Sequence, residues 1–110
     1  MARFNKIQTL QAIIQTGMVP VYYNADITIA QQVVKACYEG GVRAFEFTNR
    51  GDFAHEVFGQ LAKFAAKECP ELILGVGTVV DPATAALGHQ RRHGMMGVER
   101  AVEVDPDDLL

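Results

Sequence analysis

The stretch that decides the fold is Gly40-Gly41-Val42-Arg43-Ala44-Phe45-Glu46-Phe47-Thr48-Asn49-Arg50-Gly51. The apolar residues Ala44, Phe45 and Phe47 follow a glycine pair, a pattern typical of a buried β-strand that begins after a turn. Burying an unpaired carboxylate is costly, so Glu46 in the middle of this strand predicts a charged partner or a shifted pKa. Perturbed carboxylates gather where protons are transferred. With Arg50 just beyond the strand, the stretch predicts an active site at the strand's carboxyl end.

The two-residue period of a strand sorts these side chains onto two faces. Ala44, Glu46 and Thr48 share one face, and Phe45 and Phe47 share the other. We expect the phenylalanines to pack against helices and the smaller, polar face to line an interior. A carboxylate pointing into such an interior could act as a general acid or base.

Glu46 and Arg50 each have an alternative interpretation. Glu46 could form an ion pair near the surface with Arg43, Arg50 or a lysine. Arg50 lies four residues further on, about 13 Å along an ideal strand, so it pairs with Glu46 only if the backbone turns. A guanidinium at a strand exit suits the binding of a carboxylate or phosphate, and the alternative is an ordinary surface arginine.

Upstream of this stretch, the pattern predicts a leading helix and one strand–helix unit. The leading helix has Gly17 at its C-cap and apolar residues at helical spacing, namely Ile7, Leu10, Ile13 and Ile14. A strand follows over residues 18–23. Asp26 and Thr28 are candidate N-caps of the next helix. Its expected inner face consists of Ile29, Val33, Ala36 and Cys37.

Downstream, two more units follow. The central strand covers 43–48, and Asp52 is the expected cap of a helix that ends before Pro70. The expected inner face of this helix is Val57, Leu61, Phe64 and Ala65. A third strand covers 72–78, and Asp81-Pro82 starts a further helix that continues to Leu87.

Successive strand–helix units predict an α/β fold with parallel strands and right-handed crossovers. Strands that are apolar on both faces agree, because parallel sheets are covered by helices or close into a packed barrel. The periodicity stops after residue 87. We therefore expect one unit over 1–87 and a divergent tail over 88–110, explained by a truncated gene, a frameshift or an artificial junction.

The composition favours a soluble globular protein. The 110 residues are 49% hydrophobic and 21% charged, with a formal net charge of -3. This charge offers no electrostatic argument for nucleic acid or an anionic membrane. No apolar run reaches the roughly 18 residues that span a bilayer, and we find no signal peptide. We expect a cytoplasmic protein whose two cysteines are reduced thiols.

Two further motifs could carry chemistry. Gly75-Val76-Gly77-Thr78 resembles a phosphate loop only weakly, and the more specific expectation is that Thr78 presents its hydroxyl at the same end as Arg50. His89 and His93 are four residues apart, as in some metal-binding helices. Glycines flank this pair closely, so we expect no metal site. His55 is expected on the surface, in the first turn of its helix.

Four motifs together resemble the 2-keto-3-deoxy-6-phosphogluconate and 4-hydroxy-2-oxoglutarate aldolase family. The motifs are Val19-Pro20-Val21, Gly40-Gly41-Val42-Arg43, Glu46-Phe47-Thr48-x-Arg50 and Gly75-x-Gly77-Thr78-Val79. The resemblance covers residues 1–87. It implies a (β/α)8 TIM barrel, usually in a homotrimer, and a class I aldolase that works through a Schiff base without a metal or other cofactor.

The resemblance also implies roles for three residues. Glu46 would be the catalytic glutamate that moves protons through a bound water, Arg50 the substrate-binding arginine and Thr78 an active-site threonine. The implied reaction is the reversible cleavage of a 2-keto-3-deoxy sugar acid phosphate to pyruvate and glyceraldehyde 3-phosphate.

The sequence departs from the family at the nucleophile. The family forms its imine with a lysine on the sixth barrel strand, and no lysine here matches it. The lysines are Lys6, Lys35, Lys63 and Lys67. We therefore expect no aldolase activity from this chain alone. The alternatives are a non-catalytic half-barrel that pairs through an open strand edge, or a binder of small anions that uses Arg50 and Thr78.

Overall fold

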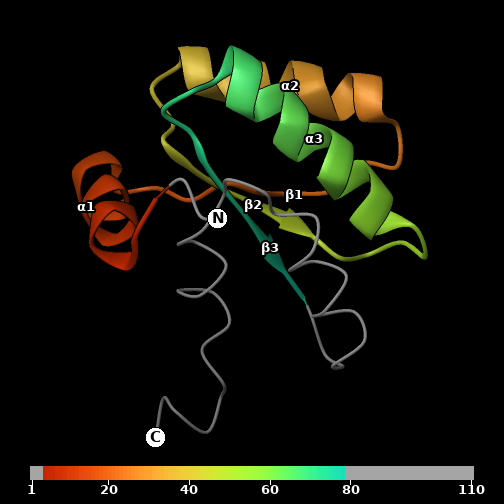
Figure 1. Cartoon of the computed structure of the whole chain (residues 1–110), viewed down its shortest axis with the longest axis horizontal. Coiled ribbons are helices and arrows are strands. Elements are labelled where there is room, and N and C mark those ends of the chain that lie inside the picture. Colours follow the sequence, from red (N-terminus) through yellow and green to blue (C-terminus); the bar gives the residue numbers. More distant parts are fainter. Residues whose placement is uncertain (1–3, 79–110) are drawn as a thin grey trace, which may run out of the picture.

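The structure is a computed structural model, and it describes residues 4–78 (Figure 1). Within this range the elements are α1 (Lys6–Thr16), β1 (Val21–Tyr22), α2 (Ile27–Glu39), β2 (Ala44–Thr48), α3 (Ala54–Glu68) and β3 (Ile73–Gly77). The sheet order is β1-β2-β3 and both pairs are parallel, which confirms the predicted α/β arrangement. The helix expected from Asp81 and the tail over 88–110 lie outside the described residues.

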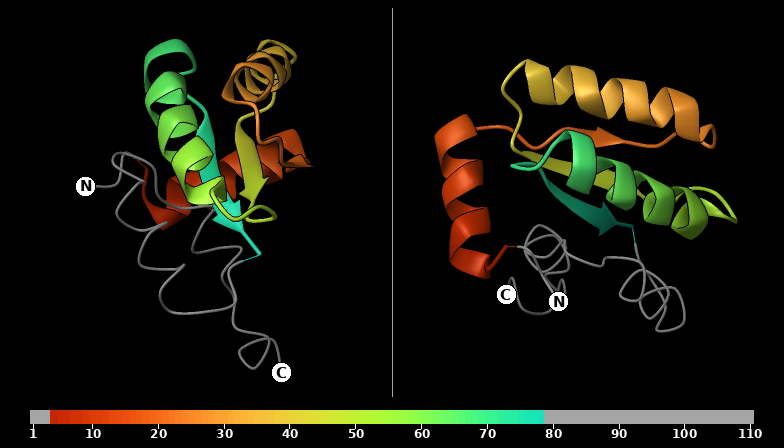
Figure 2. Two further views of the ribbon diagram at one scale, coloured as in Figure 1. Left: turned by 90° about the vertical axis from the view of Figure 1, so that its right-hand side faces the viewer. Right: turned by 45° about the horizontal axis from the view of Figure 1, so that its top comes forward.

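The helices pack against the sheet in two different ways. Helices α2 and α3 lie side by side over one face of the sheet, while α1 stands across the amino ends of the strands (Figure 2). Phe45 and Phe47 are fully buried in the cluster beneath α2 and α3. Ala44 and Ile73 form a separate cluster with residues in and around α1. The predicted division of β2 into a phenylalanine face and a smaller face is therefore confirmed.

The helix ends show which capping predictions were right. Gly17 is the C-cap of α1 with φ 67°, as predicted, because glycine adopts this left-handed conformation without strain. Asp26 caps α2 by accepting a hydrogen bond from the backbone N–H of Thr28 at 2.8 Å, so Thr28 is not the cap. The prediction for Asp52 was wrong. A turn in which the N–H of Ala54 bonds the carbonyl of Gly51 at 3.1 Å delays α3 by one residue, so that Phe53 is the N-cap.

Two predicted helix faces were only partly right. In α2 the fully buried residues are Ala30 and Val34, one position after Ile29 and Val33, because the stripe that faces both the sheet and α3 is rotated. In α1 the periodic residues Ile7, Leu10 and Ile14 are exposed, and Ile13 alone of the four packs on the sheet.

The expected strand over 18–23 is shorter, because only Val21 and Tyr22 pair with β2.

We predict that Phe47→Ala destabilises the fold by about 3 to 5 kcal/mol, because it leaves a cavity between β2 and α3. The Phe47 ring stacks on Phe58 at 6.3 Å between centroids and touches Tyr23 at 5.6 Å. Urea unfolding measures the change. Phe53→Ala is the matched control, since Phe53 is 67% exposed and should change stability by less than about 0.5 kcal/mol. Equal losses in both variants would contradict the described core.

Candidate functional site

Glu46 lies on the face of the sheet opposite α2 and α3. Its register partners are Val21 on β1 and Gly75 on β3, and its side chain is half-buried. The side chain leans over β3 toward Gly77. A β-carbon added at Gly77 would lie 2.5 Å from Cδ of Glu46 and closer still to Oε1, so a larger residue would force the carboxylate to leave its position. Gly75 and Gly77 are both part of β3 and do not form a phosphate loop, and Gly77 is the one that makes space for Glu46.

Arg50 reaches the field of Glu46 because the chain turns directly after β2. The N–H of Arg50 donates to the carbonyl of Thr48 at 3.0 Å, so the backbone bends here and does not continue as an extended strand. Burial raises the pKa of the Glu46 carboxyl above its usual value, and the positive charge of Arg50 lowers this pKa by a smaller amount. Within residues 4–78, no ion pair joins the two side chains, and Arg50 is exposed.

Thr78 follows β3 beside the same loop. It is exposed and has φ 60°, a left-handed conformation that is strained for a β-branched residue. Asn49 joins the two strand ends: its N–H donates to the carbonyl of Gly77 at 2.9 Å, and its side-chain amide approaches the carbonyl of Thr78 at 3.5 Å. The predicted placement of Thr78 and Arg50 at the same end of the sheet is confirmed.

Sequence reasoning missed Asn49. It contacts both the last residue of β3 and Thr78, and thereby links the carboxyl ends of β2 and β3, where the candidate site lies. The available signal was the run Asn49-Arg50-Gly51 after a strand, since asparagine and glycine favour turns.

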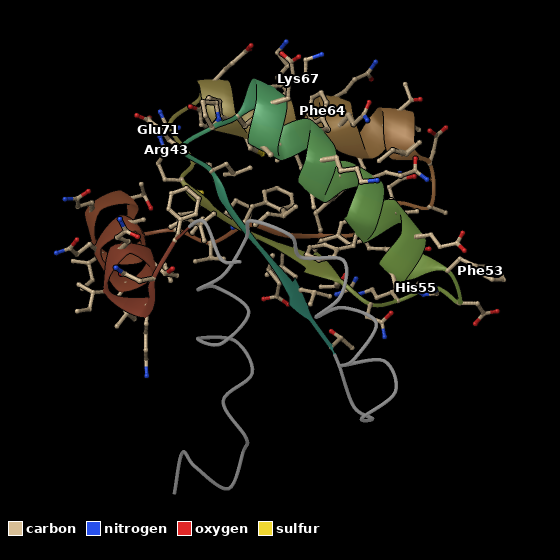
Figure 3. The ribbon with its side chains drawn as sticks, viewed as in Figure 1. Arg43, Phe53, His55, Phe64, Lys67 and Glu71 are labelled. Carbon is tan, nitrogen blue, oxygen red and sulfur yellow. The ribbon has the colours of Figure 1, made fainter. Side chains whose placement is uncertain are left out.

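Arg43 lies at the opposite end of the sheet and is not a partner of Glu46. Its guanidinium pairs with Glu71 at 3.4 Å, lies 4.3 Å from the centre of the Tyr38 ring and donates to two backbone carbonyls. Figure 3 shows Arg43 and Glu71 at the amino ends of the strands, far from Phe53 and His55 at the start of α3. A surface ion pair between Glu46 and Arg43 is therefore ruled out.

The other groups considered from sequence lie away from Glu46. All four lysines are exposed on helices, Lys6 on α1, Lys35 on α2, and Lys63 and Lys67 on α3. His55 lies in the first turn of α3, as predicted, but it is half-buried and not fully on the surface. Residues 4–78 contain no group of three or more potential metal ligands, and His89 and His93 lie outside them.

Comparison with known proteins agrees with the motifs. The chain is 38% identical over 77 residues to KHG/KDPG aldolases of Escherichia coli strain K12 and Shigella flexneri. It is 34% identical over 76 residues to a 2-dehydro-3-deoxy-phosphogluconate aldolase of Pseudoalteromonas atlantica. Each match covers 69% of this chain and 34% of the relative, so the chain spans about a third of the length of these proteins. No protein-family model matches it.

The predicted resemblance to KHG/KDPG aldolases is thus confirmed at 34–38% identity over about 69% of the chain. The described structure is compatible with part of a strand–helix fold of this kind. None of the helices within residues 4–78 has both the length and the apolar character needed to cross a bilayer.

We predict that Gly77→Ala displaces the Glu46 side chain, because the new methyl group would occupy the position of the carboxylate. The obstructing atoms are the end of a flexible side chain that can rotate away, so the expected cost is only about 1 kcal/mol, as for a side chain pushed off its rotamer, and it is measured by urea unfolding. The same change in a Glu46→Ala background should cost far less, since the obstructing group is then absent. An equal cost in both backgrounds would show that Glu46 does not lie over Gly77.

We predict that Glu46→Gln stabilises the protein at neutral pH. Because burial raises the folded-state pKa, the folded protein binds more protons than the unfolded chain between the two pKa values, and wild-type stability falls as the pH rises through this window. Glutamine carries no charge to bury, so its advantage should disappear in acid, below the unfolded pKa. Urea unfolding at a series of pH values measures the difference.

Glu56→Gln is the matched control for this prediction. Glu56 is exposed in the first turn of α3, where a negative charge favours the helix. Its glutamine variant should show no gain at neutral pH. A Glu46→Gln variant that is less stable than the wild type at pH 7 would contradict the sign derived for Glu46.

Proposed function

We propose that this chain carries the proton-transfer and anion-binding part of a 2-keto acid aldolase, a carbon–carbon lyase. The observation that carries the proposal is a half-buried carboxylate with a raised pKa, held over a glycine at the carboxyl end of a parallel sheet and within the field of an arginine. Enzymes use carboxylates of this kind for proton transfer near neutral pH. The names of the similar proteins support the same assignment.

In this proposal each of the three site residues has one task. Glu46 takes up and returns a proton, through a water molecule, as the carbon–carbon bond of 2-keto-3-deoxy-6-phosphogluconate breaks to give pyruvate and glyceraldehyde 3-phosphate. Arg50 binds an anionic group of the keto acid, and the Thr78 hydroxyl hydrogen-bonds the same substrate. Arg50 is exposed after a turn, where a guanidinium is free to form paired hydrogen bonds with a carboxylate.

We further propose that residues 1–87 are the first part of a (β/α)8 barrel, that 88–110 are a divergent segment, and that the barrel forms homotrimers in the cytoplasm. Two features support the barrel. The strands are parallel in the order β1-β2-β3, and Glu46 occupies the face opposite α2 and α3, as an interior residue of a barrel would. Active sites of such barrels lie at the carboxyl ends of the strands, where Arg50 and Thr78 are found.

The Schiff-base step needs an amine, and residues 4–78, which include all four lysines of the sequence, do not place one near Glu46. Lys35, Lys63 and Lys67 lie on the helices that cover the other face of the sheet, and Lys6 begins α1. The nucleophile would have to come from outside these 110 residues. By itself the chain would bind a keto acid without cleaving it, which is also the anion-binding alternative.

We predict that the 110-residue chain binds pyruvate reversibly but forms no covalent adduct. Titration with pyruvate, followed by amide NMR shifts, should show saturable binding centred on Glu46, Arg50 and Thr78. Borohydride added to the saturated sample should trap no lysine adduct detectable by mass spectrometry. The absence of saturable binding would overturn the proposed site, and a trapped lysine would overturn the proposed lack of a nucleophile.

The two arginines that flank β2 provide a matched control. Arg50→Gln should weaken pyruvate binding by about tenfold or more, as expected for the loss of a charge-assisted hydrogen bond. Arg43→Gln should leave the affinity unchanged, because Arg43 lies at the amino end of the sheet beside Glu71. Similar losses in both variants would point to non-specific attraction of the anion.

A further inference from the structure

The loop that carries Arg50 is in contact with Tyr23, which follows β1. A β-carbon added at Gly51 would lie 2.8 Å from Cζ of Tyr23 and closer still to its hydroxyl oxygen. Gly51 is not among the glycines with positive φ, which are Gly17 and Gly41. A side chain at residue 51 would therefore force the Tyr23 hydroxyl to move, whereas the backbone conformation itself would accept it.

Tyr23 is itself held in place from β2. Its ring lies 5.6 Å from that of Phe47, at an interplanar angle of 52°, and Phe47 is fully buried. Tyr23 is half-buried at the edge of the main core cluster. The tyrosine thus connects the rigid centre of the sheet to the loop after β2, with its ring on the core and its hydroxyl end on Gly51.

We propose that Tyr23 is the positioning residue for Arg50: by packing against Gly51 it holds the loop after β2 so that the guanidinium stays close to Glu46. The proposal rests on the proposed function, in which Arg50 and Glu46 act on the same substrate. It adds a residue that none of the four resemblance motifs contains. Within residues 4–78 no hydrogen bond joins Tyr23 to Glu46 or Arg50, and in this proposal Tyr23 acts through the loop.

The backbone hydrogen bonds of the loop lie on either side of the contact with Tyr23. On one side of Gly51, the N–H of Arg50 bonds the carbonyl of Thr48 at 3.0 Å, and on the other the N–H of Ala54 bonds the carbonyl of Gly51 at 3.1 Å. The first helical residues after this turn receive no side-chain cap. Packing by Tyr23 supplies a fixed contact at the middle of the turn.

The pKa of Glu46 depends on the position of the Arg50 charge, so measuring this pKa shows whether Arg50 has moved, without any bound ligand. Among the charged side chains of residues 4–78, Arg50 is the one whose field lowers the Glu46 pKa. If the loop shifts so that Arg50 moves away, the pKa of Glu46 rises. Carbon-detected NMR of the Glu46 carboxyl, followed against pH in the full chain, measures this directly.

We expect Arg50→Gln to raise the Glu46 titration midpoint and to set the upper limit of the effect. Gly51→Ala, which forces the Tyr23 hydroxyl away, should reproduce most of that rise. Tyr23→Phe should raise the midpoint by less than Gly51→Ala does. Gly51→Ala combined with Tyr23→Leu should bring the midpoint back toward the wild-type value, because leucine leaves room for the methyl group of Ala. Amide spectra verify that each variant is folded.

Tyr22→Phe is the matched control, since it removes a hydroxyl from the neighbouring tyrosine. The Tyr22 hydroxyl accepts a hydrogen bond from the Asn24 amide at 3.3 Å, away from Gly51, so this variant should leave the midpoint unchanged. The proposal is overturned if Gly51→Ala and Tyr23→Phe leave the midpoint at its wild-type value, or if Tyr22→Phe shifts it equally. Because no keto acid is present, this result is independent of whether pyruvate binds.

Discussion

The structure depends on the strict alternation of side chains along β2. This central strand pairs with β1 on one side and β3 on the other, so its position fixes which residues of both neighbours lie beside it. Phe45 and Phe47 are driven into the cluster beneath α2 and α3 by the burial of aromatic surface. Glu46 must then project to the opposite face. A shift by one residue would bury the carboxylate under the helices and expose the phenylalanines, so the same force that forms the core also places the candidate acid–base group.

Glu46 is held between two opposing electrostatic effects. Partial burial disfavours its charge, Arg50 favours it, and burial is the larger effect. Both effects follow from backbone geometry on neighbouring strands. Gly77 allows the carboxylate to lie close against β3. The turn after Thr48 keeps Arg50 nearer to Glu46 than an extended continuation of β2 would. The site is thus built by contacts between strand ends, which explains why residues such as Asn49 and Gly51 matter although they carry no charge.

Much of this arrangement could be predicted from sequence because it depends on local periodicity. The alternation in β2 predicted its two faces, Gly17 predicted the end of α1, and the succession of strands and helices predicted parallel pairing. The faces of α1 and α2 were harder to predict, because apolar spacing shows that a helix has a buried stripe but not which neighbours it meets. In α2 the contact with both the sheet and α3 rotates the stripe to Ala30 and Val34.

By itself, the sequence determined the order of the elements and the face on which Glu46 projects, because each depends on residues close together in the chain. It also determined the resemblance to KHG/KDPG aldolases, because matching residues can be compared without a structure. Only the tertiary structure decided that Glu46 lies over Gly77, that Arg43 pairs with Glu71 instead, and that Tyr23 packs against Gly51. Each of these contacts joins residues from different strands or loops. Their distances depend on strand register and turn geometry, which no local pattern of residues specifies.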